Sequence, residues 1–174
     1  MSGEGGEMRG EDFVHDLYDA CYPRLVGQLT AVTGSREEAE DVVQEAFARA
    51  LLNGRAVYEA ANPEAWLRTV AVNEARSRWR RVRRFTGLLP RLVPEVAEEI
   101  ESAGRMDLIA ALQQLPRAQR EAIALHHLAG LPVHEVAATL DVPTGTVKAR
   151  LARGRAALAA RLGEDDTRAE IRHG

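Results

Sequence analysis

The chain has 174 residues, of which 45% are hydrophobic and 5% aromatic, and its formal net charge at pH 7 is −3. This length is sufficient for one ordinary domain or for two small ones. No run reaches the ~18 consecutive apolar residues that a membrane-spanning helix needs, and no signal peptide opens the sequence, so we expect a cytoplasmic protein without membrane insertion. The single cysteine, Cys21, excludes an intramolecular disulfide and a multi-cysteine metal site.

Basic residues are concentrated in two segments, although the net charge is close to neutral. Residues 66–84 contain seven arginines against a single acid, Glu74, and residues 143–162 contain four arginines and Lys148 without any acid. Local patches of this kind govern nucleic-acid affinity more than the overall charge does. The alternative is that both segments are solvated helix faces.

The N-terminal half is predicted to be helical after a short tail. Residues 1–10 are rich in Gly and Glu, and we expect a disordered tail there. From residue 11 the apolar residues recur with a helical period. Pro23 is expected to kink or split this helix, and Gly34 is expected to end it.

A second helix is predicted to start after Ser35, because Ser35 and Glu38 form a capping box. It should end at Asn53-Gly54, followed by a loop over residues 55–61. Asn62-Pro63 then predicts a third helix, with Asn62 as the N-cap and Pro63 as the first helical residue. The apolar stripe of the second helix, which should be buried, is Ala39, Val42, Val43, Ala46, Phe47, Ala50 and Leu51.

The rest of the chain divides into a linker, a second helical domain and a tail. Residues 85–105 contain Gly and Pro breaks and an acidic run, which predicts a flexible linker. Its residues 95–102 are compatible with a short helix. Residues 106–163 form the second helical domain, and residues 164–174 a tail. No alternation of period two predicts a strand. The predicted fold class is all-α: two small helical domains, at residues 11–84 and 106–163, joined by a flexible linker.

The end of the second domain has the pattern of a helix-turn-helix. A helix at residues 133–140 and a basic helix from Thr144 to about residue 162 flank a short turn. Ala137 is small where the helices must approach each other, and Asp141 tolerates the left-handed backbone that such a turn requires. Thr144 is the expected N-cap, where the helix N-terminus can hold a phosphate.

The basic helix predicts a DNA-reading face opposite its apolar face. Val147, Leu151 and Leu158 fall on the apolar face. Small residues beside cations let a helix enter the major groove, so we expect Lys148 and Arg153 to contact bases and Arg150 and Arg155 to contact phosphates. The alternative is a helical hairpin with a basic exterior. The remaining members of the predicted face are Gly145, Thr146, Ala149 and Ala152.

Nothing in the sequence predicts a catalytic, metal or cofactor site. His134-Glu135 lacks the second histidine of a zinc-protease motif, because residue 138 is Ala. His126 and His127 are adjacent and make a poor chelate on a helix. Cys21 lies on an apolar helix face, which favours a packed thiol. We therefore expect a protein that is not an enzyme and uses no cofactor.

These motifs together resemble a known family, the extracytoplasmic-function (ECF, group 4) sigma factors of the sigma-70 family. The sequence Asp41-Val-Val-Gln-Glu-Ala-Phe47 is similar to the most specific signature of the family. Asn62-Pro-Glu-Ala-Trp-Leu67 and Asn73 follow at family-like spacing. Gly145-Thr-Val-Lys148 and Arg150-Leu-x-Arg-Gly-Arg155 resemble the family's C-terminal domain. The resemblance covers roughly nine tenths of the chain.

The resemblance implies a function and a set of contacts. The N-terminal domain would bind core RNA polymerase and the −10 element, and the C-terminal domain would read the −35 element of promoter DNA. The polymerase contacts would be Asp41, Gln44, Glu45 and Phe47. The −10 contacts would be Arg55, Tyr58, Asn62, Trp66, Asn73, Arg76 and Arg80; Trp66 is alternatively a core residue. The −35 contacts would be Thr144, Gly145, Thr146, Lys148, Ala149, Arg150, Ala152, Arg153 and Arg155.

One position departs from the family pattern, and two other functions compete. Ser77 stands where members often carry an aspartate, so the resemblance implies that the −10 helix is held differently here. The resemblance also implies an anti-sigma factor as a further partner. A conventional regulator would instead bind a palindromic operator without polymerase. A protein-binding adaptor would leave both arginine-rich segments unexplained.

Overall fold

A computed structural model of the chain describes residues 4–86 and 103–172, and these residues form helices, turns and no strands. The predicted all-α class is confirmed. The chain divides into two compact units, Met1–Ala97 and Glu98–Gly174. The division falls within the predicted linker, and the short helix expected at residues 95–102 lies outside the described residues.

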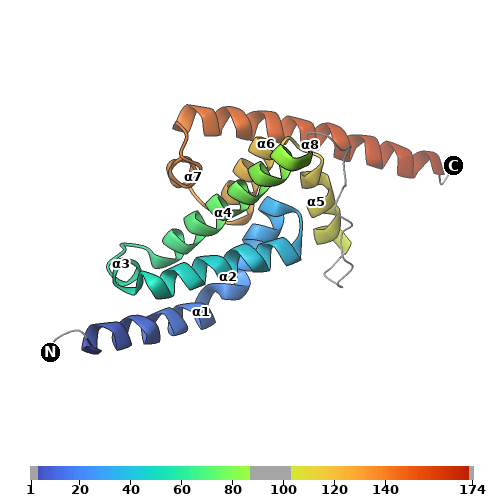
Figure 1. Cartoon of the computed structure of the whole chain (residues 1–174). Helices are drawn as coiled ribbons and strands as arrows, with labels where there is room; N and C mark the ends of the chain where they lie inside the picture. The colour runs from blue at the N-terminus through green and yellow to red at the C-terminus, as the bar shows by residue number, and fades with distance from the viewer. Residues whose placement is uncertain (1–3, 87–102, 173–174) are drawn as a thin grey trace. The chain divides into compact units, whose positions relative to one another are not determined.

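Unit 1 is built from α1 (Glu4–Thr33), α2 (Arg36–Leu52), the short α3 (Gly54–Tyr58) and α4 (Pro63–Thr86). α2 packs against both α1 and α4, so the three long helices share one apolar core (Figure 1). The largest side chains of this core that are fully buried are Leu25, Leu29, Val32, Val42, Val43, Val57, Leu67 and Val72.

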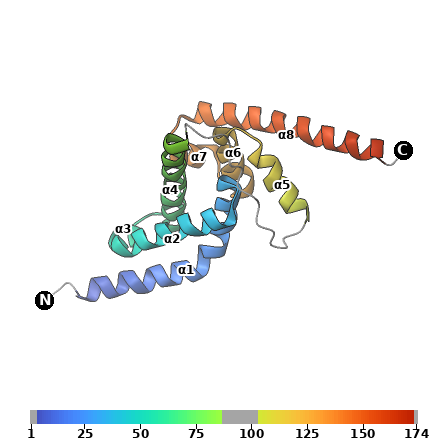
Figure 2. The ribbon, with the colours of Figure 1, turned by 45° about the vertical axis from the view of Figure 1, so that its right-hand side comes forward.

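The N-terminal helix is longer than predicted. α1 begins at Glu4, so the expected disordered tail at residues 1–10 is corrected for residues 4–10. A Cβ added to Gly10 would lie 3.6 Å from the Cα of Gly54. This close approach of two glycines provides α1 with a packing partner in α3, which the local composition does not reveal. α1 runs through Pro23 without being split, and its ribbon bends along its length, as a proline-containing helix does (Figure 2).

The predicted helix boundaries around α2 are confirmed. Gly34 follows the end of α1 with a φ of 85°, a left-handed conformation that glycine adopts without strain. The Oγ of Ser35 accepts a hydrogen bond of 3.2 Å from the backbone N–H of Glu38. Leu51, which was expected in the buried stripe, is 53% exposed. The last buried residue of the stripe is Ala50.

The connection to α4 is partly helical. The predicted loop over residues 55–61 contains α3, whose Val57 is buried and pulls the segment against α1 and α2. Asn62 caps α4 as predicted, since its Oδ1 accepts a hydrogen bond of 3.0 Å from the N–H of Ala65. Pro63 is the first residue of α4.

Unit 2 contains α5 (Ala103–Gln113), α6 (Arg117–Ile123), α7 (Val133–Leu140) and the long α8 (Thr144–Arg172). A π-helical turn, Ala124–Leu128, directly follows α6. After this turn, Gly130 takes a left-handed φ of 71°. Nδ1 of His126 lies 2.7 Å from the carbonyl oxygen of Leu131. The largest fully buried side chains of unit 2 are Leu112, Leu125, Val136 and Leu140.

Both ends of α8 differ from the prediction. Thr144 is its first residue, and the carbonyl of Pro143 accepts from the N–H groups of Thr146 and Val147, so Thr144 is not the N-cap. The expected tail over residues 164–174 is corrected up to Arg172, where α8 ends. A glycine within a helix costs only about 1 kcal/mol relative to alanine, so Gly163 alone does not end it.

Candidate nucleic-acid interface

The acidic signature of α2 lies on one face of the helix, and its polar groups are already bonded. Asp41 and Gln44 are exposed, and Glu45 is half-buried. A carboxylate oxygen of Asp41 lies 3.5 Å from Nη1 of Arg78. Glu45 accepts a hydrogen bond of 2.8 Å from Nε of Arg49. We call the face carrying Asp41, Gln44 and Glu45 the acidic surface; these three predicted residues are brought together.

Phe47 does not belong to this surface. Its side chain is buried, with only 5% of the residue exposed, and the rings of Tyr18 and Tyr22 on α1 lie 5.0 and 6.2 Å from it. The two tyrosines stack on each other at 4.4 Å, and the amide of Gln44 donates a hydrogen bond of 3.4 Å to the hydroxyl of Tyr22. Phe47 therefore packs beneath the acidic surface, in the buried stripe that the sequence predicted for this helix.

Glu74, the only acid within residues 66–84, connects α4 to α2. Glu74 is 8% exposed, and its carboxylate contacts Arg49 at 2.7 Å and both Arg78 and Arg81 at 3.1 Å. Burial opposes ionisation of this group, but the hydrogen bonds from Arg78 and Arg49 outweigh it, and the pKa of Glu74 is lowered from its ordinary value. Glu74 is therefore an ionised carboxylate that binds three guanidinium groups.

The arginines of α4 are not equivalent. Arg68 is 6% exposed and donates to Gln28 and Glu64, so it belongs to the interior of unit 1. Asn73 and Arg80 are exposed, and Arg76 is half-buried. These three predicted residues lie on the side of α4 opposite its buried residues, and we call this side the α4 basic face.

The other predicted −10 residues lie in α3 and at the start of α4. Arg55 is exposed and pairs with Glu59 at 2.9 Å. The ring of Tyr58 is 62% exposed and meets Phe13 edge-on at 5.2 Å. The side-chain oxygen of Asn62 is used as the helix cap described above. Trp66 is half-buried.

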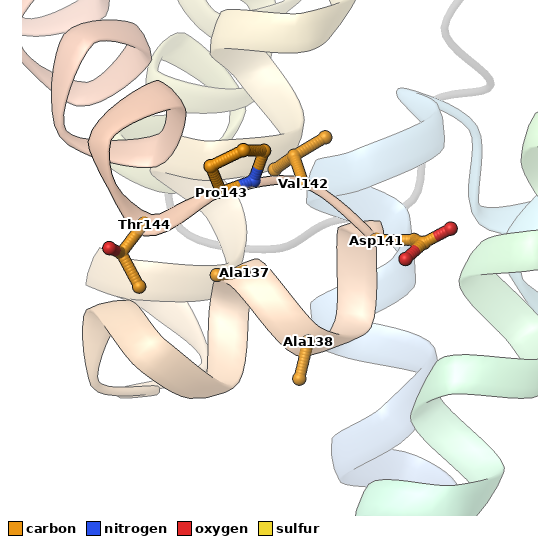
Figure 3. A pocket seen from close by; sticks show the side chains of 6 residues that line it. All are labelled: Ala137, Ala138, Asp141, Val142, Pro143 and Thr144. Atoms are coloured by element: carbon orange, nitrogen blue, oxygen red, sulfur yellow. The ribbon is translucent and has the colours of Figure 1, made fainter.

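α7, the turn and the start of α8 form the predicted helix-turn-helix. Asp141 ends α7 with a φ of 53° and a ψ of 54°, the left-handed conformation that the sequence predicted. Ala137 is 6% exposed, as the close approach of the helices requires. Figure 3 shows a hollow on this turn, with the Asp141 carboxylate and the Thr144 hydroxyl at its opposite ends. Small apolar side chains of α7 and the turn complete its lining, together with these two polar groups.

The exposed side of α8 carries the predicted DNA-reading residues. Val147 and Leu151 are buried, which fixes the opposite side of the helix toward solvent. Arg150 is half-buried, and its Nη1 is buried without a hydrogen-bond partner in the described structure. Thr146 is also half-buried. The exposed members, which we call the α8 basic face, are Thr144, Gly145, Lys148, Ala149, Ala152, Arg153 and Arg155.

Three features of these surfaces were not predicted as functional. Tyr18 and Tyr22 lie on α1, far in sequence from the acidic signature that they flank. Glu74 was noted as an isolated acid among arginines, and that isolation was the available signal. Gly154 lies within α8, where a Cβ would be 2.9 Å from Cγ1 of Ile123, so α6 and α8 meet there.

The described residues contain few groups suited to catalysis or to metal binding. Cys21 is buried, and burial raises the pKa of its thiol to about 11, so it remains a packed, protonated group. Among the described residues, no group of three or more His, Cys, Asp or Glu side chains could hold a metal ion. No described helix is long and apolar enough to cross a membrane.

Comparison with known proteins assigns both units. Residues 17–85 match the family "Sigma-70 region 2", and residues 105–158 match "Sigma-70, region 4". The chain is 32% identical over 168 residues to the ECF RNA polymerase sigma factor EcfG of Rhodopseudomonas palustris, covering 90% of this chain and 93% of that protein. It is 30% identical to the ECF RNA polymerase sigma factor SigM of Mycobacterium tuberculosis, covering 95% of this chain and 85% of the relative.

A solved structure agrees with these sequence relatives. The sigma factor RpoE of Bartonella quintana, crystallised with the anti-sigma factor NepR, superposes with a TM-score of 0.76 at 29% identity, covering 88% of this chain and 98% of that one. Two helical units with these two matches define a transcription initiation factor of the sigma-70 type. The chain belongs to the ECF sigma factors of the sigma-70 family. It is an RNA polymerase sigma factor, which acts in promoter recognition and transcription initiation.

Proposed function

We propose that the acidic surface of α2 docks on core RNA polymerase, while the α4 and α8 basic faces contact the −10 and −35 elements. The observation that supports this most is the separation of charge. The acids Asp41 and Glu45 lie on one helix, and exposed cations lie on two others, one in each unit. A carboxylate surface disfavours DNA, because like charges repel, and favours a basic protein partner.

On the −35 side, α8 would enter the major groove. Small residues at Gly145, Ala149 and Ala152 let the helix approach the base edges, and Lys148 and Arg153 can reach guanine acceptors. Arg155 is exposed and free to reach a phosphate, which would fix the register of the helix on the duplex.

On the −10 side, α4 would lie along the duplex edge of the opened region. Asn73, Arg76 and Arg80 would meet the backbone, and Arg55, Tyr58 and Asn62 would lie near an unstacked base. Extruding a base costs a few kcal/mol, which stacking on an aromatic ring such as that of Tyr58 or Trp66 can offset.

Polymerase and chromosomal DNA share the bacterial cytoplasm, so the chain would act there. It would need no cofactor and carry out no catalytic step itself, since polymerase makes the transcript. The relative of known structure forms a complex with an anti-sigma factor, and we propose a partner of the same kind here.

The function is tested by in vitro transcription with purified core polymerase on a library of genomic fragments. We expect transcripts from a small set of fragments sharing two elements at fixed spacing, and none when the chain or the core enzyme is omitted. Transcription that is independent of the chain, or that starts without sequence preference, would contradict the proposal.

The −35 assignment is tested by binding of the holoenzyme to the promoter so selected. Lys148→Ala and Arg153→Ala should each cost about 1–3 kcal/mol and relax base preference at one position. Arg161→Ala is the matched control, because Arg161 lies farther along α8 and bonds to Gln114 instead. Equal losses from all three variants would count against base reading by Lys148 and Arg153.

A further inference from the structure

We propose that Glu74 is a positioning residue, which presents the guanidinium of Arg81 to a promoter phosphate while anchoring it to α2. This inference rests on the proposed function of α4. It adds a DNA contact, Arg81, that the sequence prediction did not include, and it assigns a role to Glu74, the one acid within residues 66–84.

The two oxygens of the Glu74 carboxylate have different partners. Oε2 accepts a hydrogen bond of 2.7 Å from Nη2 of Arg49, which lies on α2. Oε1 accepts bonds of 3.1 Å from Nε of Arg78 and from Nη2 of Arg81, both on α4. The carboxylate side chain is only 10% exposed. One oxygen therefore fixes the carboxylate to the neighbouring helix, and the other holds the two arginines of its own helix.

Of these three arginines, Arg81 is the one available to DNA. Arg49 divides its donors between Glu45 and Glu74. Arg78 also reaches Asp41, and its side chain is 33% exposed. The side chain of Arg81 is 58% exposed, and its bond to Glu74 uses Nη2 alone. A guanidinium has five N–H donors in a rigid fork, so one that is held by a single carboxylate oxygen can still bind a phosphate.

The position of Arg81 on α4 places it beside the α4 basic face. At 100° per residue, Arg81 lies about 80° around the helix from Asn73, and Arg80 lies about 20° from Asn73 on its other side. Arg81 is thus at the edge of the basic face that is nearer to α2. A side chain that is already held loses less conformational freedom on binding, which increases affinity without a new contact.

The test measures binding of the holoenzyme to a fluorescent duplex of the promoter that in vitro transcription selects, at several salt concentrations. Arg81→Ala should weaken binding and reduce the slope of log K against log salt by about one. Glu74→Gln should weaken binding about threefold to tenfold, although it removes a negative charge. The double variant should bind no more weakly than Arg81→Ala alone, because Glu74 acts through Arg81.

Glu64→Gln is the matched control. It makes the same charge change on the same helix, at a carboxylate that bonds Arg24 and Arg68 instead, and it should leave promoter binding unchanged or slightly tighter. Arg81→Lys provides a variant that keeps both the charge and the exposed position. It should lose affinity while preserving the salt slope, because lysine lacks the fork that Glu74 holds.

Two results would overturn the inference. One is an Arg81→Ala holoenzyme whose affinity and salt slope equal those of the wild type, a result that stands even if Glu74→Gln proves too unstable to assay. The other is a double variant whose loss is the sum of the two single losses. Failure of the proposed function is distinguishable, because then the wild-type chain itself would form no promoter-binding holoenzyme.

Discussion

The ring of Tyr18 meets that of Phe47 edge-on, with 5.0 Å between their centroids and 66° between their planes. Tyr18 belongs to α1 and Phe47 to α2, and the contact encloses Phe47 beneath the acidic surface. A residue of the family-like signature in α2 therefore contributes to the packing of unit 1, while its polar neighbours Asp41 and Gln44 are exposed.

Truncating Phe47 should destabilise the fold. We expect Phe47→Ala to lower the free energy of unfolding of unit 1 by about 3–5 kcal/mol, because it leaves a cavity between α1 and α2. Both tryptophans, Trp66 and Trp79, lie in α4, so urea unfolding followed by tryptophan fluorescence reports on unit 1. Leu52→Ala is the control, since Leu52 is on the same helix and 85% exposed. Equal stability of the two variants would show that Phe47 is not a packing residue.

Reversing the charge of Asp41 should abolish docking without unfolding the protein. The Asp41 side chain is 58% exposed, so Asp41→Arg should leave the tryptophan-monitored stability nearly unchanged. We expect its affinity for core polymerase to fall at least about tenfold, because it places a cation against a basic partner. Glu37→Arg makes the same change at an exposed acid one turn earlier on α2 and should bind nearly as the wild type does. Losses of equal size would point to overall charge rather than to a specific surface.

Acid should weaken unit 1 through two carboxylates. Hydrogen bonding from Arg24 lowers the pKa of Glu64, and the arginines around Glu74 lower its pKa against the effect of burial. The ordinary pKa of each of these two carboxyl groups is 4.5. A carboxyl whose pKa is lower in the folded protein than in the unfolded chain stabilises the fold fully at pH values above the unfolded-state pKa. This stabilisation is lost as the pH falls through the folded-state pKa.

The measurement is the urea midpoint of tryptophan fluorescence at a series of pH values from about 7 to about 3. We expect a steady fall of the midpoint below pH 4.5, and a shallower fall in Glu64→Gln, which cannot be protonated at that position. A midpoint that is flat over this range, or a variant as sensitive as the wild type, would exclude these ion pairs as the cause.

Two glycines of α8 should respond in opposite ways to alanine. A Cβ at Gly154 would lie 2.9 Å from Cγ1 of Ile123, a β-branched side chain that is 4% exposed and has little freedom to move. Gly154→Ala should therefore cost unit 2 about 1–3 kcal/mol through overpacking. A Cβ at Gly145 would meet nothing within 4 Å, so Gly145→Ala should be neutral or stabilising.

Thermal unfolding followed by far-ultraviolet circular dichroism compares these two variants. Tryptophan fluorescence in the same samples should be unaffected, because it reports on unit 1. A Gly154→Ala protein as stable as the wild type would mean that α6 and α8 can separate slightly at no cost.

The sequence predicted the features that depend on neighbouring residues. Gly34 and Ser35 mark a helix boundary, and Asn62 with Pro63 marks another, because caps act within a few residues of the chain. The left-handed Asp141 was predictable for the same reason. The all-α class followed from the period of the apolar residues alone.

The features that the sequence did not predict depend on contacts between distant segments. α1 starts before the predicted residue 11, and its Gly10 lies close to Gly54, more than forty residues away. The apolar stripe predicted that Phe47 would be buried, but it gave no sign that Tyr18 and Tyr22 of α1 would cover it. For the same reason, composition marked Glu74 as unusual without indicating that Arg49 of another helix would bind it.

The central claim is most directly tested by fluorescence anisotropy of the selected promoter duplex with the chain alone, with core polymerase alone and with both together. The account predicts specific binding, resistant to competitor DNA, only in the mixture, and its loss when Asp41→Arg replaces the wild-type chain. Specific binding by the chain alone, as a conventional operator-binding regulator would show, would contradict it.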